Sequence, residues 1–169
     1  MMNAVAAAYG LFQVVFANLA EHLSIATFRL RKHREPDLAL ETVFRQEFGR
    51  TLKQFREELD RFEDQPSASD NLDALRAACN VMSGLARWRN ERIHARVQLT
   101  ERGYALYDWR THQPLTITPE QIEQNIQRAI ETIGEFKAYA SHLVELLDWD
   151  KEFERFYNSL PQPSDADDG

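Results

Sequence analysis

The sequence predicts an all-α fold, an antiparallel bundle of four to five helices, from three observations. Apolar residues repeat at three- and four-residue steps through four long stretches. The six prolines, at positions 36, 66, 114, 119, 161 and 163, fall between these stretches, as helix boundaries require. The 169 residues are 43% hydrophobic, which suffices for the core of one domain. We expect one helical-bundle domain over residues 1–160 and a disordered acidic tail over 161–169.

The first helix is predicted over residues 3–32, and its first twenty residues carry no charge. The apolar positions that share one face are Leu11, Val15 and Leu19. No basic segment precedes them, as a signal peptide would require, and Gln13 and Asn18 interrupt the apolar run. We therefore expect this helix to pack inside the bundle, with no membrane insertion.

The single cysteine, Cys79, lies within an apolar helical pattern. One thiol cannot form an internal disulfide or build a thiolate metal site alone. We expect a buried, inert thiol, which is compatible with a cytoplasmic location.

A second helix is predicted after Pro36, with Asp37 as its N-cap. Its apolar stripe consists of Phe44, Phe48, Leu52, Phe55, Leu59 and Phe62. The polar segment over residues 64–69 is predicted to be a loop because it combines proline, serine and aspartate.

The third helix is predicted over residues 70–97. Its inward positions are Leu75, Ala78, Met82, Leu85, Ala86, Ile93 and Val97. Residues 99–117 then lose the helical period. Because apolar residues at 103–107 and 115–117 flank the polar stretch 110–113, we expect a short irregular or two-stranded excursion there.

The last helix has the clearest start in the chain. Thr118 is predicted to be the N-cap, with Pro119 at the first helical position and Gln121 three residues after the cap, which together make a capping box. The predicted buried face consists of Ile122, Ile126, Ile130, Ile133, Phe136, Ala140, Leu143 and Leu147. The helix is expected to continue to about residue 160.

Charge is distributed unevenly along the chain. The formal net charge is −7, and three aspartates lie in the tail. By contrast, residues 87–102 contain five arginines against Glu91 and Glu101, a local balance of +3. The overall acidity argues against a protein that coats nucleic acid through a broad basic face, whereas a local positive field suits a small anionic site.

The chemically distinctive segment lies within this basic stretch. On a helix, Asn90 and His94 stack at i and i+4, and Arg89, Arg92 and Arg96 follow one another along another face. A histidine exchanges protons near neutral pH, and arginines hold phosphate and stabilise charge on it. RNA carries its own nucleophile, the 2′-hydroxyl, beside the phosphate that it attacks. One histidine with arginine therefore suffices in principle for RNA cleavage without a metal.

The hexapeptide RNERIH at residues 89–94 resembles the R-x(4–6)-H motif of the HEPN superfamily. In that family the arginine is often followed by a polar residue such as asparagine, and the motif lies late in a bundle helix, before the last long helix. The resemblance covers the helical chain as architecture and these six residues as motif. One departure is Arg96, which stands where a toxin subgroup has tyrosine.

The resemblance implies a metal-independent endoribonuclease, with no cofactor, that works as a homodimer in toxin–antitoxin, defence or RNA-processing systems. Arg89 would stabilise the phosphate, His94 would transfer protons and Asn90 would orient them, while Arg87, Arg92 and Arg96 are candidate RNA-phosphate contacts. On a straight helix Arg89 and His94 point about 140° apart, which a composite site shared by two protomers would resolve. The implied partners are RNA, a second copy of the chain, and an antitoxin or regulatory protein.

Two other interpretations fit the same residues. In the first, the arginines form a solvated helix face and His94 is a structural residue, so that the protein is a non-catalytic HEPN-like binding module, such as an antitoxin or scaffold. In the second, Glu91 and His94 form one Glu-x-x-His unit of a di-iron bundle. That site needs a second such unit, and the sequence contains no other.

Overall fold

The structure is a computed structural model of the 169-residue chain. It describes residues 2–64, 68–93, 95–100, 103–108, 110–115 and 117–159. For residues 2–4, 69, 96–100, 103–106 and 149–159, only the backbone path is described. The predicted tail over 161–169 and His94 lie outside the described residues.

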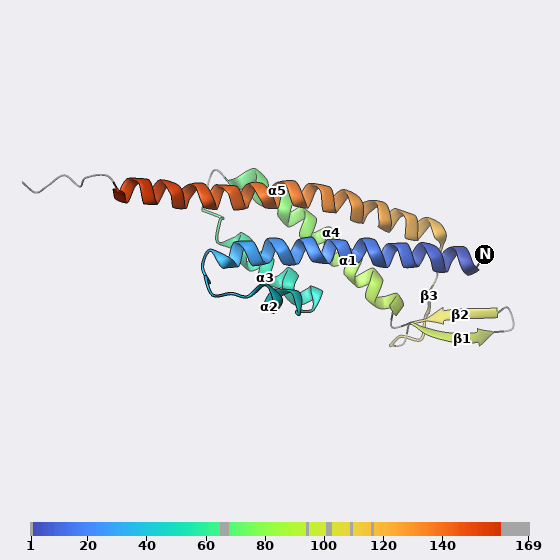
Figure 1. The fold of residues 1–169 in the computed structure, drawn as a ribbon. Helices are drawn as coiled ribbons and strands as arrows, with labels where there is room; N and C mark the ends of the chain where they lie inside the picture. The colour runs from blue at the N-terminus through green and yellow to red at the C-terminus, as the bar shows by residue number, and fades with distance from the viewer. Residues whose placement is uncertain are drawn as a thin grey trace, which may run out of the picture.

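The fold is an all-α bundle built around two long helices, which confirms the predicted all-α class, but these two helices are parallel and not antiparallel as predicted. Helix α1 (Met2–Lys32) and helix α5 (Pro119–Ser159) lie side by side and run in the same direction (Figure 1). Helix α4 (Ser69–Ile93) runs antiparallel to both. The parallel pair arises because the segment between α4 and α5 begins and ends at the same end of the bundle, where α1 starts (Figure 1).

The predicted second helix is divided into α2 (Leu40–Phe44) and α3 (Phe48–Asp60). Extended backbone at Ala39, not Asp37, precedes α2, and a second extended residue, Glu47, precedes α3. The break reorients the chain so that the Phe48 ring packs 4.9 Å from that of Phe16 in α1. The prediction of one continuous stripe was therefore wrong at its beginning, since Phe44 stays exposed.

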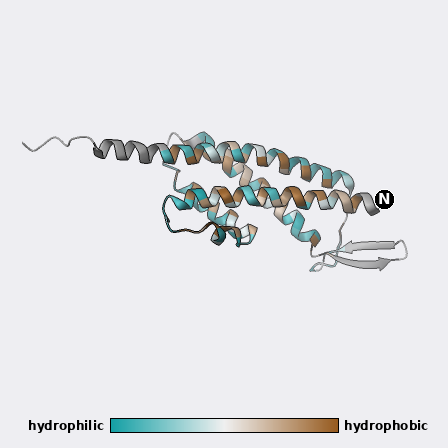
Figure 2. Cartoon of the chain, in the orientation of Figure 1, coloured by the Kyte–Doolittle hydropathy of each residue, from teal (hydrophilic) through white to brown (hydrophobic). Residues whose placement is uncertain are grey.

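The core lies where α1, α3, α4 and α5 meet. Its largest fully buried side chains include Phe12, Leu19, Leu23, Phe55, Leu59, Leu75, Met82, Leu85, Phe136 and Leu143. The apolar residues of α1 extend along most of the helix (Figure 2). By length and composition Val5–Lys32 could cross a membrane, a test that buried core helices also pass. The predicted absence of membrane insertion stays a prediction.

A small antiparallel sheet replaces the predicted end of the third helix. Strands β1 (Arg96–Thr100), β2 (Gly103–Tyr107) and β3 (Pro114–Leu115) form it in that order. Helix α4 therefore ends at Ile93, and Arg96 and Val97 belong to β1, not to a helix face. The reason is the alternation of polar and apolar residues in β1, which pairs residue by residue with β2.

The predicted pairing of the two flanking segments is confirmed as β2 and β3, joined by a turn at Asp108. The Asp108 carboxylate accepts hydrogen bonds from the backbone N–H groups of Arg110 and Thr111, which hold its pKa below the ordinary value. His112 closes the turn with φ of 55°, in the left-handed region.

The capping box of α5 is also confirmed. The Gln121 N–H donates to Thr118 Oγ1 at 3.2 Å, and the Thr118 N–H donates to Gln121 Oε1 at 3.5 Å. The predicted buried face of α5 is wrong at Ile130, which is 49% exposed, while the neighbouring Ala129 is buried. Both positions fit the helical period of the sequence. The rotation of α5 against its neighbours places Ala129 in the core and leaves Ile130 exposed.

Candidate functional site

The C-terminal end of α4 packs against the N-terminal half of α1 through one indole ring. The centre of the Trp88 ring lies 4.8 Å from the centre of the Phe12 ring, in an edge-to-face arrangement, and 6.0 Å from the centre of the Tyr9 ring. Aromatic pairs in such geometries add to the energy of apolar burial. The contact fixes the part of α4 that carries the predicted motif.

Arg89 is held in one orientation by three contacts. Its Nε donates to Gln13 Oε1 of α1 at 2.8 Å, and its Nη1 donates to Asn90 Oδ1 at 3.3 Å. The guanidinium carbon lies 5.2 Å from the centre of the Phe16 ring, a cation–π distance. Arg89 is half-buried, and its Nη2 donates to no described residue. The side chain is thus fixed while part of its hydrogen-bonding capacity is uncommitted.

Arg92 is packed more deeply than Arg89. Its side chain is 10% exposed, and its guanidinium carbon lies 4.3 Å from the centre of the Trp88 ring. Its Nη1 donates to the Trp88 carbonyl oxygen and to Glu91 Oε2, both at 3.1 Å. The structure therefore places this predicted phosphate contact over the indole ring.

Several buried donors gather between α1 and α4. Tyr9 Oη, Gln13 Nε2 and Arg92 Nε are buried and find no hydrogen-bond partner among the described residues. Burial raises the pKa of the Tyr9 hydroxyl, against the opposing effects of the Gln13 side chain and of the two positive charges on Arg89 and Arg92. The region around Arg89 therefore gathers buried polar groups of α1 and α4 beside two arginines, and the positive charges of Arg89 and Arg92 favour an anion nearby.

The other predicted site residues are placed apart or lie outside the described part of the chain. Arg87 is exposed on α4. Arg96 begins β1, so the predicted row of three arginines on one helix face is wrong at its third member. His94 lies outside the described residues, so its position relative to Arg89 stays a prediction. The structure brings together Arg89 and Asn90.

Sequence reasoning missed the contribution of α1 to this site. Tyr9 and Gln13 lie one helical turn apart and face α4. The sequence feature that could have indicated this contribution is the presence of an amide, Gln13, and a phenol, Tyr9, within an otherwise apolar helix. Each of these side chains needs a polar partner when it is buried. Nothing in the sequence alone indicates that this partner is Arg89.

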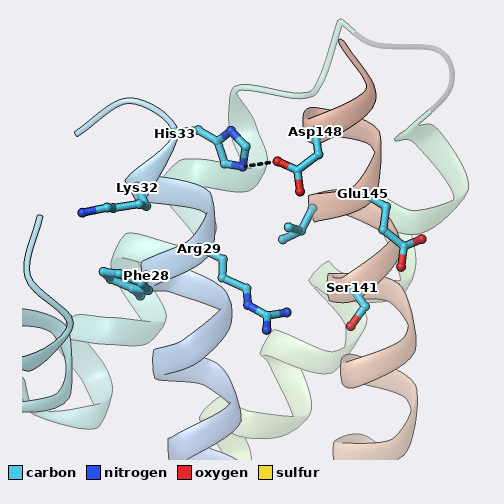
Figure 3. A pocket seen from close by; sticks show the side chains of 8 residues that line it. Phe28, Arg29, Lys32, His33, Ser141, Glu145 and Asp148 are labelled. Atoms are coloured by element: carbon cyan, nitrogen blue, oxygen red, sulfur yellow. Dashed lines mark ion pairs between the residues drawn. The ribbon is translucent and has the colours of Figure 1, made fainter. Parts of the chain in front are cut away.

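A second concave region lies between the other halves of α1 and α5. One cavity of about 570 Å³ is lined by Phe28, Arg29, Lys32, His33, Ser141, Val144, Glu145 and Asp148. A neighbouring cavity of about 230 Å³ shares Arg29, Ser141 and Val144 with it. In Figure 3, His33, in the turn that follows α1, meets Asp148 of α5 across the larger cavity, with His33 Nε2 and Asp148 Oδ1 3.4 Å apart.

No set of three or more His, Cys, Asp or Glu side chains within the described part of the chain has a geometry that could hold a metal ion. No protein-family model matches the chain, and no curated protein or solved structure matches it.

Proposed function

We propose that this chain is a metal-independent endoribonuclease of the HEPN type that acts as a homodimer. The observation that carries the proposal is the half-buried Arg89, which Gln13 and Asn90 orient while its Nη2 donates to none of the residues that the structure describes. A guanidinium held in this way is prepared for an oxyanion, because little side-chain freedom remains to be lost when the anion binds.

The chemistry divides between two side chains. The His94 imidazole takes the proton of the 2′-hydroxyl, whose oxygen forms a bond to the adjacent phosphorus. The bond from phosphorus to the 5′-oxygen breaks, and that oxygen takes up a proton from solvent. Arg89 stabilises the additional negative charge on the phosphate oxygens. The products are a 2′,3′-cyclic phosphate and a free 5′-hydroxyl.

Exposed apolar residues on the N-terminal half of α1 offer a surface for the second copy. The side chains of Leu11 and Val14 are 54% and 66% exposed. At about 100° per residue they point roughly 160° and 100° away from Gln13 around the helix axis, so they lie on the face of α1 that is turned away from Arg89. Two large exposed apolar side chains suit a contact that excludes water.

The alternative is a non-catalytic helical binding module. It is supported by Arg92, whose guanidinium carbon lies 4.3 Å from the centre of the Trp88 ring and whose side chain is 10% exposed, a packing that needs no RNA. Such a module would use the same exposed face of α1 to bind a protein. RNA turnover separates the two functions, whereas dimerisation does not.

The test is cleavage of a labelled structured RNA in excess EDTA. Wild-type protein is compared with Arg89→Ala, His94→Ala and the matched control Arg128→Ala, which removes an exposed arginine of α5. We expect the two motif variants to lose about 100-fold or more in rate, as enzymes that lose one oxyanion contact do, and the control to retain activity. Cleavage that survives both motif substitutions would contradict the proposal. If no RNA is cut although all four proteins are folded, the binding module is favoured.

A mixing experiment tests the composite site. In a two-fold symmetric dimer, Arg89→Ala paired with His94→Ala leaves one site with both side chains intact. An equal mixture of the two inactive variants, unfolded and refolded together, should therefore recover roughly a quarter of wild-type activity. If the mixture stays as inactive as its components, Arg89 and His94 act within one protomer.

A further inference from the structure

The groove between α1 and α5 lies far from the proposed nuclease site. Arg29, which lines both of its cavities, follows Gln13 by sixteen residues, about 24 Å along the helix axis. The groove holds a smaller cavity of about 230 Å³ beside a larger one of about 570 Å³, and both open to the surface between α1 and α5. The groove therefore needs an explanation of its own.

The smaller cavity combines an apolar wall with positive charge. Ile25, Phe136 and Val144 supply apolar surface, and the cations that line it are Arg29 and Lys137. His22 lies beside them, and burial and the nearby Lys137 charge both lower its pKa. No carboxylate is among the described residues that line this cavity. The side chains that line this cavity thus carry positive charge, on Arg29 and Lys137, which are both exposed.

Arg29 differs from the other arginines near the end of α1. Arg31 pairs with Glu35 at 2.7 Å, and Arg34 pairs with Glu58 at 3.0 Å. Arg29 and Lys137 pair with no carboxylate among the described residues. Figure 3 shows the Arg29 side chain extending from α1 across the groove toward Ser141 of α5. An arginine that reaches into a cavity without a partner is suited to a ligand oxyanion.

The acidic groups at the other end of the groove contact histidines. Asp148 Oδ1 lies 3.4 Å from His33 Nε2, and the Glu145 carboxylate points away from the groove in Figure 3, 4.0 Å from His142 Nδ1. Neither carboxylate forms an ion pair with Arg29.

We propose that the groove binds a small amphipathic anion, a carboxylate or phosphate monoester on an apolar chain. The oxyanion contacts Arg29 and Lys137, with the Ser141 hydroxyl beside them. The apolar chain lies against Ile25, Phe136 and Val144. This site is independent of the nuclease proposal, since the two share no residue.

The test is titration of the full-length ¹⁵N-labelled protein, followed by amide chemical shifts, with four eight-carbon probes. Octanoate and octyl phosphate carry the two oxyanions, whereas octanol is neutral and octylamine is cationic. We expect the anions to bind and to shift amides of residues 22–33 and 136–148, with the stronger binder identifying the preferred head group. Equal binding of octanol, or shifts confined to other parts of the chain, would overturn the proposal.

Variants test the role of the two cations. Arg29→Gln and Lys137→Gln should each weaken binding of the preferred anion about tenfold, the loss expected for one charge-assisted contact. Arg128→Gln, the same change at an exposed position of α5, should leave binding unchanged. Far-ultraviolet circular dichroism verifies that all three variants are folded. If Arg29→Gln and Lys137→Gln both bind as tightly as wild type, the anion does not occupy this groove.

Discussion

Arg89 and Arg92 are three residues apart on one helix, and the structure gives them different environments. Arg92 lies flat on Trp88, with a side chain that is 10% exposed. Arg89 reaches across to α1, where Gln13 accepts its Nε hydrogen bond. Both guanidinium groups lie over aromatic rings, but in Arg92 the Nη1 group is shared between the Trp88 carbonyl and Glu91, whereas in Arg89 the Nη2 group donates to none of the described residues. We therefore place the proposed phosphate contact at Arg89.

Gln13 is predicted to be a positioning residue for Arg89. Replacing it with alanine removes the acceptor that holds Nε, so we expect the rate of RNA cleavage to fall about tenfold, as when one charged hydrogen bond is lost. The double variant Gln13→Ala/Arg89→Lys should then cleave RNA only slightly more slowly than Arg89→Lys alone. Each substitution on its own already removes the hydrogen bond that fixes the Arg89 side chain, so their effects on the rate are not additive. Initial rates measure both effects.

The matched control is Gln127→Ala, which removes an exposed amide that bonds to Glu131 on α5. It should leave cleavage unchanged. A Gln13→Ala protein that cuts RNA at the wild-type rate would contradict the positioning role, and equal losses in both glutamine variants would indicate a general effect of substitution.

Cys79 is predicted to be unreactive in the native protein. Its side chain is fully buried, and burial raises its pKa from 9.0 to about 11 against the opposing Arg56 charge. Because the folded state disfavours the thiolate, the stability that this provides is present below pH 9 and is lost as the pH rises toward 11. At pH 8 a thiol reagent should modify Cys79 only after denaturant is added. Rapid labelling of the native protein would contradict the buried environment.

At the scale of single elements, the sequence predicted helices well where local signals agree and poorly where two periods compete. The capping box at Thr118 was predictable because cap, proline and glutamine all act within one turn. The end of α4 was not, since Val97 fits both the helical stripe and the alternation of β1. The break before α3 could not be predicted either. Phe44 and Phe48 continue one helical pattern in the sequence, and only the packing of Phe48 against α1 distinguishes them.

Thr118→Ala is predicted to destabilise the protein by about 1 kcal/mol, the usual cost of losing an N-cap side chain. The Gln121 N–H then loses its acceptor at the start of α5. Thr118→Ser keeps a hydroxyl and should restore most of the loss. Urea denaturation gives the free energy of unfolding of each variant. If alanine and serine destabilise equally, the hydroxyl is not the stabilising group.

Two apolar residues of α5 test the observed rotation of that helix. Phe136 is buried against the Phe55 ring at 5.1 Å, whereas Ile130 is half exposed. Phe136→Ala should cost about 3 to 5 kcal/mol of unfolding free energy, and Ile130→Ala less than about 1 kcal/mol. Similar losses at both positions would show that α5 buries the face that the sequence predicted instead.

At the scale of the whole molecule, α1 connects two chemically different ends. Its N-terminal half holds Arg89 through Gln13, and its C-terminal half carries Arg29 into the groove with α5. A chain with a net charge of −7 thus presents positive groups at two defined places. Such focused charge suits anionic ligands that bind at small sites, not a polymer that covers the surface.

The candidate site could be predicted from the sequence only in part. The motif and the bundle were visible as patterns along the chain. By contrast, the Gln13 contact joins residues 76 positions apart, and no local pattern encodes such a pair. The long-range half of the candidate site therefore required the fold.

The most direct test of the proposed function is cleavage of one RNA sequence in two forms, in excess EDTA. One form is all ribose, and the other carries 2′-deoxyribose at the positions where the first is cut. If the 2′-hydroxyl is the nucleophile, wild-type protein cuts the first into a 2′,3′-cyclic phosphate product and leaves the second intact at those positions, and Arg89→Ala cuts neither at a comparable rate. Equal cleavage of both forms would contradict the account, because an external water would then be the nucleophile.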